Sequence, residues 1–481
     1  MPTVDNYEGR SVLIIGGGLA GLSAAVALAP RGFRVQLIES RPRLGGRAGS
    51  FDDAQSGELI DNCQHVGLGC CTNWLDFCRT IGMGDALERY DRFIYQEPGG
   101  RRSTLGTSRL PAPFHLTPSL WKLKFFTFGE KLRLAYGVMR MVFAKNVTES
   151  VGVWLRRHWQ TERIIGRFWG PILTSALNEE LDRIDFQYAR QVIVEAFLAH
   201  RDAAAMYVPR VPLGELYGPR LEAWLKQHGA TVHAGVAATE LTIGDDGRIH
   251  CCKTRVGEFT ADHYLLAVPP NRAAALLPPD VVARHSAFTA LAAFEYSPIT
   301  SVHCWFDRPV MDVPHLTPLD MTTQWLFRRE ESANGHYVQA VVSASREIAA
   351  LGKESIRDNV VAEIRSIFPA AKDANLVHCR VVTERSATFS IRPSVDAIRP
   401  SPTTPIGNLF LAGDYVQTGW PATMEGAVRS GLLAAEAILA AVERPESLVD
   451  QGLPVGRFCA WLLRRPRENA KMIGPVAATH A

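Results

Sequence analysis

The clearest hydrophobic pattern of the chain lies close to its start. Val12 to Ile15 form a short apolar run, which predicts a buried strand. A glycine-rich turn follows, and a helix of small residues is predicted through Leu28. Arg34 to Glu39 then form a second strand that ends in an acid. This order of strand, helix and strand is typical of a βαβ unit in a parallel sheet.

The rest of the chain alternates between helical and strand-like patterns. Helices are expected over residues 72–81, 220–227, 354–368 and 423–442, and a mostly helical region over 111–207. Strands are expected over residues 229–233, 237–243, 248–255, 264–270, 299–306, 324–328, 337–343, 377–384 and 408–414. The sequence has no uncharged apolar run of about 18 residues, so we expect no membrane-spanning helix.

Length and composition indicate a globular protein with two domains. At 481 residues the chain exceeds what one hydrophobic core usually supports. The net charge of +3 is too small to indicate nucleic acid as a partner. The nine cysteines include no Cys-x-x-Cys pair, and the pairs at 70–71 and 251–252 lack a histidine at metal-ligand spacing. We therefore expect reduced thiols, no metal site and, because residues 1–8 are polar, no signal peptide.

The turn Gly16-x-Gly18-x-x-Gly21 has the chemistry of a dinucleotide site. Gly16 permits a tight turn, Gly18 lets the backbone approach a pyrophosphate, and Gly21 lets the helix pack closely on the strand. The N-terminus of the helix faces the phosphates. Glu39 follows at about the distance expected for an acid that binds a ribose hydroxyl. Cofactor contacts are also expected from the neighbouring residues Leu19, Ala20 and Ser40.

Three further segments resemble the flavin-dependent amine oxidase and phytoene desaturase superfamily. They are the loop Pro42-x-x-Gly45-Gly46-Arg47, the strand that ends at Gly413-Asp414, and the helix start at 421–431. In that superfamily the loop approaches the phosphates and flavin of FAD. The acid holds the ribityl chain or a phosphate-side hydroxyl, and the helix N-terminus points at the flavin pyrimidine. The resemblance implies FAD as the cofactor and contacts from Gly45, Gly46, Arg47, Val236, Gly413, Asp414, Ala422, Thr423 and Met424.

Two segments carry a narrower resemblance. Asp61-Asn62-x-Gln64-His65-Val66 and Glu384-x-x-Ala387-Thr388-Phe389 are similar to segments of the squalene-associated FAD-dependent desaturases, which are hydroxysqualene dehydroxylases. Plant-type carotene desaturases carry a related stretch. Cys63 stands where the dehydroxylases have glycine, a departure that affects the local backbone. The alternative is a polar loop in which His65 only caps a turn.

The resemblance covers most of the chain and implies an α/β fold. It combines a Rossmann-type (GR2-like) FAD-binding domain with an interleaved α+β substrate-binding domain. We expect the FAD-binding domain to comprise residues 1–105, 208–270 and 400–442 and the substrate-binding domain residues 106–207 and 271–399, with residues 443–481 as a C-terminal tail.

The resemblance also implies a reaction, the reductive removal of the hydroxyl of hydroxysqualene in squalene and hopanoid synthesis. Such a hydroxyl needs a proton donor to leave, and the resulting allylic cation takes a hydride from reduced flavin in a site without water. Candidates for the acid are His65 and Glu425, with Asp61 a more distant third. Glu425 could instead only form a hydrogen bond beside the flavin. The electron donor is not identified by the sequence.

Residues 118–146 are both apolar and basic. Their cations are opposed by a single acid, Glu130, and comprise Lys122, Lys124, Lys131, Arg133, Arg140 and Lys145. Such a segment can lie in a membrane interface, or it can pack on a core with a solvated basic face. Because squalene-type substrates partition into bilayers, we expect a cytoplasmic enzyme that binds peripherally to the inner face of the cell membrane. Residues 458–469 are a second candidate contact or a frayed tail.

Other functions remain open. A carotenoid or phytoene desaturase would share the fold and pass electrons from a polyene to FAD. An amine oxidase with covalent flavin would need a cysteine at 419–421, which has none, and only Trp420 could face the flavin. A protoporphyrinogen oxidase fits less well. A catalytically silent flavoprotein that presents an isoprenoid to a partner enzyme is the alternative from another class.

Overall fold

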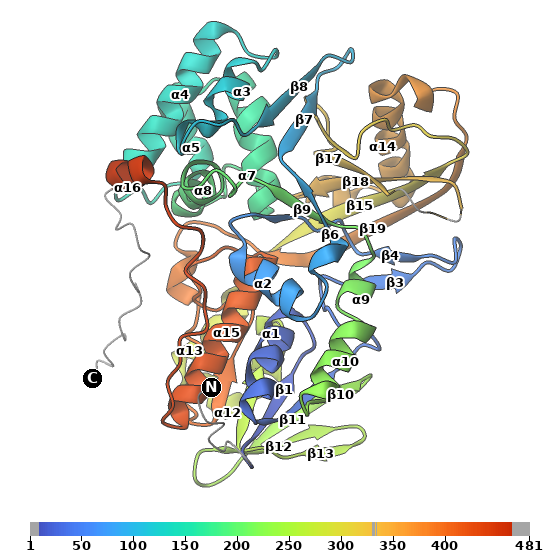
Figure 1. Ribbon diagram of the computed structural model, residues 1–481. Coiled ribbons are helices and arrows are strands. Elements are labelled where there is room, and N and C mark those ends of the chain that lie inside the picture. The colour runs from blue at the N-terminus through green and yellow to red at the C-terminus, as the bar shows by residue number, and fades with distance from the viewer. Residues whose placement is uncertain (1–8, 330–331, 333, 464–481) are drawn as a thin grey trace.

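The computed structural model describes residues 9–329, 332 and 334–463. The first layer is a five-stranded parallel sheet in the lower half of Figure 1. Its strands, in spatial order, are β10 (Thr231–Ala234), β2 (Arg34–Glu39), β1 (Ser11–Ile15), β14 (His263–Leu266) and β20 (Leu409–Leu411). All five run in one direction, so their carboxyl ends lie along one edge, which is where open α/β sheets bind ligands.

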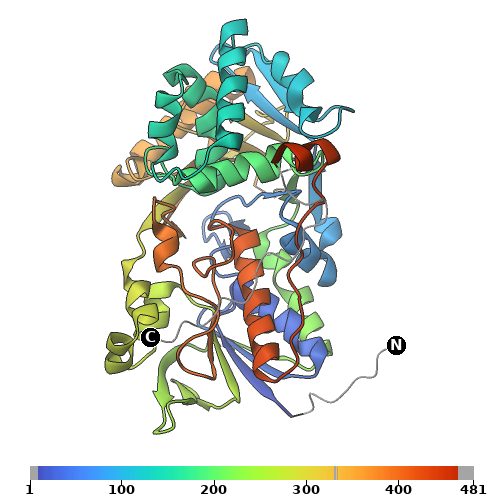
Figure 2. The same ribbon diagram turned by 90° about the vertical axis from the view of Figure 1, so that its left-hand side faces the viewer.

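Two helices of this layer pack tightly together. They are α1 (Leu19–Leu28) and α15 (Met424–Ala441), which lie side by side in Figures 1 and 2. A side chain at Gly431 would come within 2.1 Å of the Ala20 carbonyl oxygen. The small residues of both helices therefore permit this close packing, and the helices share one buried apolar cluster with strands of the parallel sheet.

A seven-stranded sheet forms the upper part of the molecule (Figure 1). Its strands, in order, are β19 (Leu376–Phe389), β15 (Tyr296–Phe306), β18 (His336–Ser343), β17 (Trp325–Arg329), β16 (His315–Pro318), β7 (Arg92–Gln96) and β8 (Arg102–Gly106). Neighbouring strands are antiparallel except for β16 and β7, which are parallel. Helix α14 (Lys353–Ile367) covers one face with an apolar side.

A helical layer packs beside this sheet, as the expected helical region predicted (Figure 2). Its helices are α3 (Thr117–Trp121), α4 (Phe128–Phe143), α5 (Val151–Arg157), α6 (Glu162–Ile164), α7 (Gly170–Leu177) and α8 (Phe186–Val192). Two π-helical segments, Ile165–Trp169 and Ile193–Leu198, continue α6 and α8. Thr127 and Glu130 form a capping box that fixes the start of α4.

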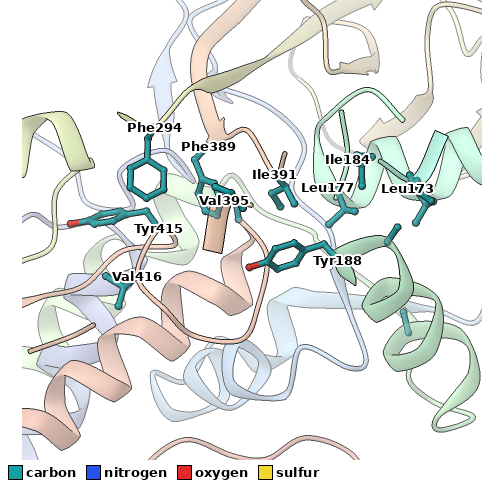
Figure 3. Packing of buried hydrophobic residues seen from close by; sticks show 14 of the residues in the cluster. Leu173, Leu177, Ile184, Tyr188, Phe294, Phe389, Ile391, Val395, Tyr415 and Val416 are labelled. Carbon is teal, nitrogen blue, oxygen red and sulfur yellow. The ribbon is translucent and has the colours of Figure 1, made fainter. Parts of the chain in front are cut away.

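The remaining elements lie around and between these layers. They are β3 (Ser50–Asp52), β4 (Leu59–Asp61), β5 (Gly67–Leu68), α2 (Thr72–Thr80), β6 (Leu87–Tyr90), β9 (Met206–Pro209), α9 (Leu213–Leu216), α10 (Pro219–Gln227), β11 (Ala238–Ile243), β12 (Ile249–Thr254), β13 (Gly257–Phe259), α11 (Pro270–Ala275), α12 (Pro279–Arg284), α13 (Ser286–Thr289) and α16 (Arg457–Leu463). One apolar cluster continues from the parallel sheet into the helical layer, and Figure 3 shows part of it, from Tyr415 and Phe389 to Leu173. No described helix is long and apolar enough to cross a membrane.

The strands of the parallel sheet all come from the segments expected for the FAD-binding domain. Strand β7 and all of β8 except Gly106 lie within the expected segment 1–105, yet they extend the other sheet through β16. The division into domains remains a proposal, and on this topology we draw its first boundary before β7. Residues 1–8 and half of the expected tail contact, residues 464–469, lie outside the described residues.

Candidate functional site

The glycine turn after β1 is too tight for side chains. A Cβ atom at Gly16, whose φ is +115°, would lie 2.4 Å from the Ala267 carbonyl oxygen. A Cβ atom at Gly21 would lie 2.0 Å from the Gly16 carbonyl oxygen. The turn therefore brings the start of α1, with Leu19 and Ala20, directly to the carboxyl edge of the sheet, where free N–H groups can meet a phosphate.

Glu39 is fixed at the end of β2 by the neighbouring backbone. Its carboxylate accepts hydrogen bonds from Gly17 N at 2.7 Å, Arg41 N at 2.8 Å and the Ser40 hydroxyl at 3.0 Å. Its carbonyl accepts from Val236 N at 2.8 Å. The structure thus gathers Glu39, Ser40 and Val236 beside the glycine turn. An acid at this position suits a ribose hydroxyl in this type of fold.

The second glycine pair lies against the first turn. Gly45 N donates to the Gly17 carbonyl at 2.8 Å, and Gly46 lies next to Gly18. Arg47 follows and forms an ion pair with Asp414 at 2.6 Å. Burial disfavours the charge of Arg47, but the charge and hydrogen bond of Asp414 outweigh it and raise the pKa of the guanidinium. One arginine thus links the two loops that the resemblance assigns to FAD.

The C-terminal segment completes this edge of the sheet. Gly413 N donates to the Ser430 hydroxyl at 2.8 Å, and Asp414 follows it. Thr423 caps α15 by accepting from Gly426 N, so Ala422 and Met424 flank the N-terminus of a second helix. Two helix N-termini, a ribose acid and an arginine are the groups that bind a dinucleotide with a diphosphate, and the residues present therefore fit FAD.

His65 lies in the loop between β4 and β5. Its Nδ1 is 2.9 Å from the Cys63 carbonyl oxygen, which can only accept, so Nδ1 carries a proton. Its Nε2 makes no hydrogen bond within the described part of the chain. Burial lowers the pKa of His65 and nearby Arg47 adds to this, whereas the Cys63 carbonyl and Asp61 act in the opposite direction. Cys63 has no left-handed backbone, so its side chain causes no strain there.

Asp61 lies at the start of the same loop, almost fully buried. It accepts from the Ser50 hydroxyl at 2.6 Å and from Leu213 N at 2.8 Å, and Arg329 lies 3.3 Å away. Burial raises the pKa of Asp61 although these partners favour its charged form. Its bonds tie the loop to strand β17 through Arg329, a residue that no sequence motif singles out.

Glu425 has a different setting. Its carboxylate is fully buried and accepts from the Asn73 side chain at 2.7 Å and from Trp74 N at 2.8 Å. Arg429 lies 3.6 Å away, one turn along α15. Burial raises the pKa of Glu425, and the hydrogen bonds to Trp74 and Asn73 offset part of that effect. These contacts fasten the N-terminus of α2 to α15, and no hydrogen bond of Glu425 reaches the His65 loop.

Arg399 is a functional residue that no sequence motif singles out. Its side chain is 1% exposed, and it donates to several groups of the loop that follows Asp414. No sequence spacing identifies Arg399, because its hydrogen bonds are made to the loop after Asp414, and only the folded chain brings this loop beside the arginine. Among the described residues, no group of three His, Cys, Asp or Glu side chains could hold a metal ion.

Comparisons with known proteins identify the family of the chain. The family model for flavin containing amine oxidoreductase matches residues 19–439. A hydroxysqualene dehydroxylase from Rhodopseudomonas palustris is 30% identical over 440 residues, which cover 90% of this chain and 99% of that protein. A 15-cis-phytoene desaturase from Synechococcus elongatus is 27% identical over 458 residues, 89% of this chain and 96% of that protein.

A solved structure shows the same fold. An oxidoreductase from Methanosarcina mazei superposes with a TM-score of 0.69 at 14% identity, over 90% of this chain and all of that chain. At this identity the likeness concerns the fold alone. The likeness confirms the expected Rossmann-type architecture. The flavin family model confirms FAD as the cofactor. The chain therefore belongs to the flavin-containing amine oxidoreductase family, as an FAD-dependent oxidoreductase related to hydroxysqualene dehydroxylases.

Proposed function

We propose that this protein converts hydroxysqualene to squalene by removing its hydroxyl with electrons from reduced FAD. The relation to a hydroxysqualene dehydroxylase over nearly the full length of both proteins supports the substrate. The observation that carries the chemistry is His65, whose Nδ1 is held by the Cys63 carbonyl while Nε2 has no partner among the described residues. An imidazole held in this way can present one proton to a substrate.

The protonated form of His65 is the acid in this proposal. Nδ1–H stays on the Cys63 carbonyl, and Nε2–H passes to the hydroxyl, which leaves as water. When bound, reduced FAD supplies the hydride that replaces the hydroxyl. Asp61 favours the imidazolium that the step requires, while burial and Arg47 keep the fraction of imidazolium low. Glu425 serves here as a positioning residue, because its hydrogen bonds hold α2 to α15.

An apolar cluster beside the loop can shelter an isoprenoid. Cys63 packs there with Phe327 and Val341 of the seven-stranded sheet. Partly buried apolar residues lie against this cluster, namely Val66, Val208, Ile299 and Trp325. The described contacts provide hydrocarbon surface next to His65, which suits a neutral C30 chain and excludes water from the cation.

We also propose that the protein takes its substrate from a membrane surface. Large apolar side chains are exposed along residues 110–143, namely Leu110, Phe114, Trp121, Phe128, Leu132, Met139 and Phe143. Lys122, Lys124 and Arg133 are exposed among them. The one acid of this segment, Glu130, is occupied by the helix cap and by Arg163 at 3.4 Å. Apolar side chains with surrounding cations suit a bilayer with anionic head groups.

Helix α16 extends this surface. It lies beside the helical layer in Figure 1, where Gly456 N donates to the Ala199 carbonyl at 2.9 Å. The rings of Phe458 and Phe114 are 5.2 Å apart, and Trp461 continues the aromatic row from Phe458. Segments more than 300 residues apart thus contribute to one apolar surface.

A carotenoid or phytoene desaturase is the second candidate, because a phytoene desaturase is 27% identical over a similar span. The two functions differ in the direction of electron flow. We would incubate the FAD-loaded protein with hydroxysqualene and dithionite and analyse the products by mass. Squalene is the expected product. Unchanged hydroxysqualene, with desaturated products when the oxidised protein is given phytoene, would favour the desaturase.

A further inference from the structure

Arg399 lies directly behind the loop that follows β20. Its Nη2 donates to the carbonyl oxygens of Asp414 at 3.0 Å and Val416 at 2.6 Å, and to the Thr418 hydroxyl at 3.2 Å. Its Nε donates to the Tyr415 carbonyl at 3.3 Å. Three consecutive carbonyl groups are therefore turned toward one guanidinium.

The charge of Arg399 is buried with little negative charge around it. The guanidinium lies over the Phe389 ring at 5.3 Å and the Tyr188 ring at 5.8 Å, and Figure 3 shows these rings with Tyr415 and Val416. Its one carboxylate partner among the described residues is Asp396 at 3.4 Å, which is 67% exposed. Burying a charge among dipoles and rings is costly unless its hydrogen bonds are satisfied. The guanidinium of Arg399 has its hydrogen bonds satisfied by the carbonyls of the loop 414–418. A positive charge is therefore held beside this loop.

Because the carbonyls of residues 414–416 face Arg399, the direction of the N–H groups in the same loop is also fixed. In a trans peptide the C=O and the following N–H point in opposite directions. The Asp414 carbonyl faces Arg399, so the Tyr415 N–H faces away from it. The next two N–H groups donate to the Gly413 and Pro400 carbonyls, whereas the Tyr415 N–H has no acceptor in the described part of the chain. A buried N–H without an acceptor is rare and is suited to a ligand.

The same loop begins with Asp414, which is paired with Arg47. We propose that Arg399 is a cofactor-positioning residue: it fixes the loop 414–418 against FAD, and its buried positive charge favours the reduced, negatively charged cofactor. A fixed positive charge close to a flavin stabilises added electrons, and a buried charge is poorly screened by salt. This inference depends on FAD binding and is independent of the hydroxysqualene reaction.

The test separates the hydrogen bonds of Arg399 from its charge. Arg399→Lys keeps the charge and loses most of the carbonyl contacts, whereas Arg399→Met loses both. The affinity for FAD is measured by flavin fluorescence, and the midpoint potential by dye-coupled reduction. Both variants should bind FAD roughly tenfold more weakly or worse, as expected for lost hydrogen bonds to a charged group. Only Arg399→Met should show a clearly lower midpoint potential.

Tyr188→Phe is the matched control, because it removes a hydroxyl that bonds to Arg399 and leaves the charge in place. Its potential should equal that of the wild type. If Arg399→Met does not retain FAD, Arg399→Gln serves as the neutral variant. An FAD-loaded neutral variant with the wild-type potential would overturn the role of the charge. An Arg399→Lys protein with wild-type affinity for FAD would overturn the role in positioning.

Discussion

His65 Nδ1 lies 2.9 Å from the carbonyl oxygen of Cys63, two residues earlier in the same loop. This short contact fixes the imidazole and its tautomer without using a second element of the fold. It also means that a residue other than glycine at position 63 is compatible with the loop, because the contact is made by the backbone.

His65→Gln should lose most of the activity while FAD remains bound. A general acid typically contributes roughly 10²–10⁴-fold to a rate, and glutamine cannot supply the proton. Burial lowers the pKa of His65. The active imidazolium is therefore present at low pH, and turnover should fall as the pH rises through a pKa below the ordinary value. Single-turnover rates against pH measure this, and a variant with the rate and pH profile of the wild type would exclude His65 as the acid.

Glu425→Gln should affect stability more than chemistry. The amide oxygen can still accept one hydrogen bond, but the contacts to Asn73 and Trp74 cannot both be kept. We expect a loss of roughly 1–3 kcal/mol in the free energy of unfolding and a smaller loss of rate than in His65→Gln. Urea unfolding and single-turnover kinetics give the two values. A larger rate loss than in His65→Gln, at unchanged stability, would make Glu425 the acid.

Gly21→Ala should abolish FAD binding. The added Cβ would meet the Gly16 carbonyl oxygen at 2.0 Å, and backbone cannot move as a flexible side chain can. Gly129→Ala is the matched control, since a Cβ there meets nothing within 4 Å in the first turn of α4. It should be neutral or stabilising by about 0.5–1 kcal/mol. Flavin content and thermal melting compare the two, and a Gly21→Ala protein purified with full flavin would contradict the account.

Binding to anionic vesicles should depend on the apolar surface of α4 and α16. Phe128 is 70% exposed and Trp461 72% exposed, and both should be required. Phe128→Ser and Trp461→Ser should each weaken co-sedimentation, and salt should weaken it for the wild type. Val256→Ser is the control, because Val256 is 71% exposed on the turn between β12 and β13. An equal loss of co-sedimentation in all three variants, or no binding of the wild type to vesicles at low salt, would show that this surface does not bind membranes.

Protonation of buried histidines should destabilise the fold below about pH 6.5. His115 is fully buried, and neither ring nitrogen has a hydrogen-bond partner among the residues that the structure describes. Burial lowers the pKa of His115 to about 4. Because the folded pKa lies below the unfolded one, the unfolded state binds more protons, and stability falls as the pH falls. His115→Leu should reduce the loss of stability between pH 7 and pH 5 by roughly 2 kcal/mol. Melting curves of both proteins test this, and parallel pH profiles would contradict it.

The parts that the sequence predicted are those with a strong local pattern. The glycine turn, Glu39 and the helix beginning at Met424 are each recognisable in a few consecutive residues, and the structure brings them to one edge. What could not be predicted depends on distant packing. The parallel pairing of β7 with β16 joins residues over 200 positions apart. Arg399 and Arg329 belong to no recognisable motif in the sequence. Their contacts, with the Asp414 carbonyl and with the Asp61 carboxylate respectively, form only in the folded chain.

The most direct test of the central proposal is anaerobic mixing of the reduced, FAD-loaded protein with hydroxysqualene in detergent. Flavin absorbance and product mass are followed together. We expect the flavin to be reoxidised and one squalene to form for each flavin. A flavin that stays reduced, together with bleaching of the oxidised protein by phytoene, would contradict it and make the protein a desaturase.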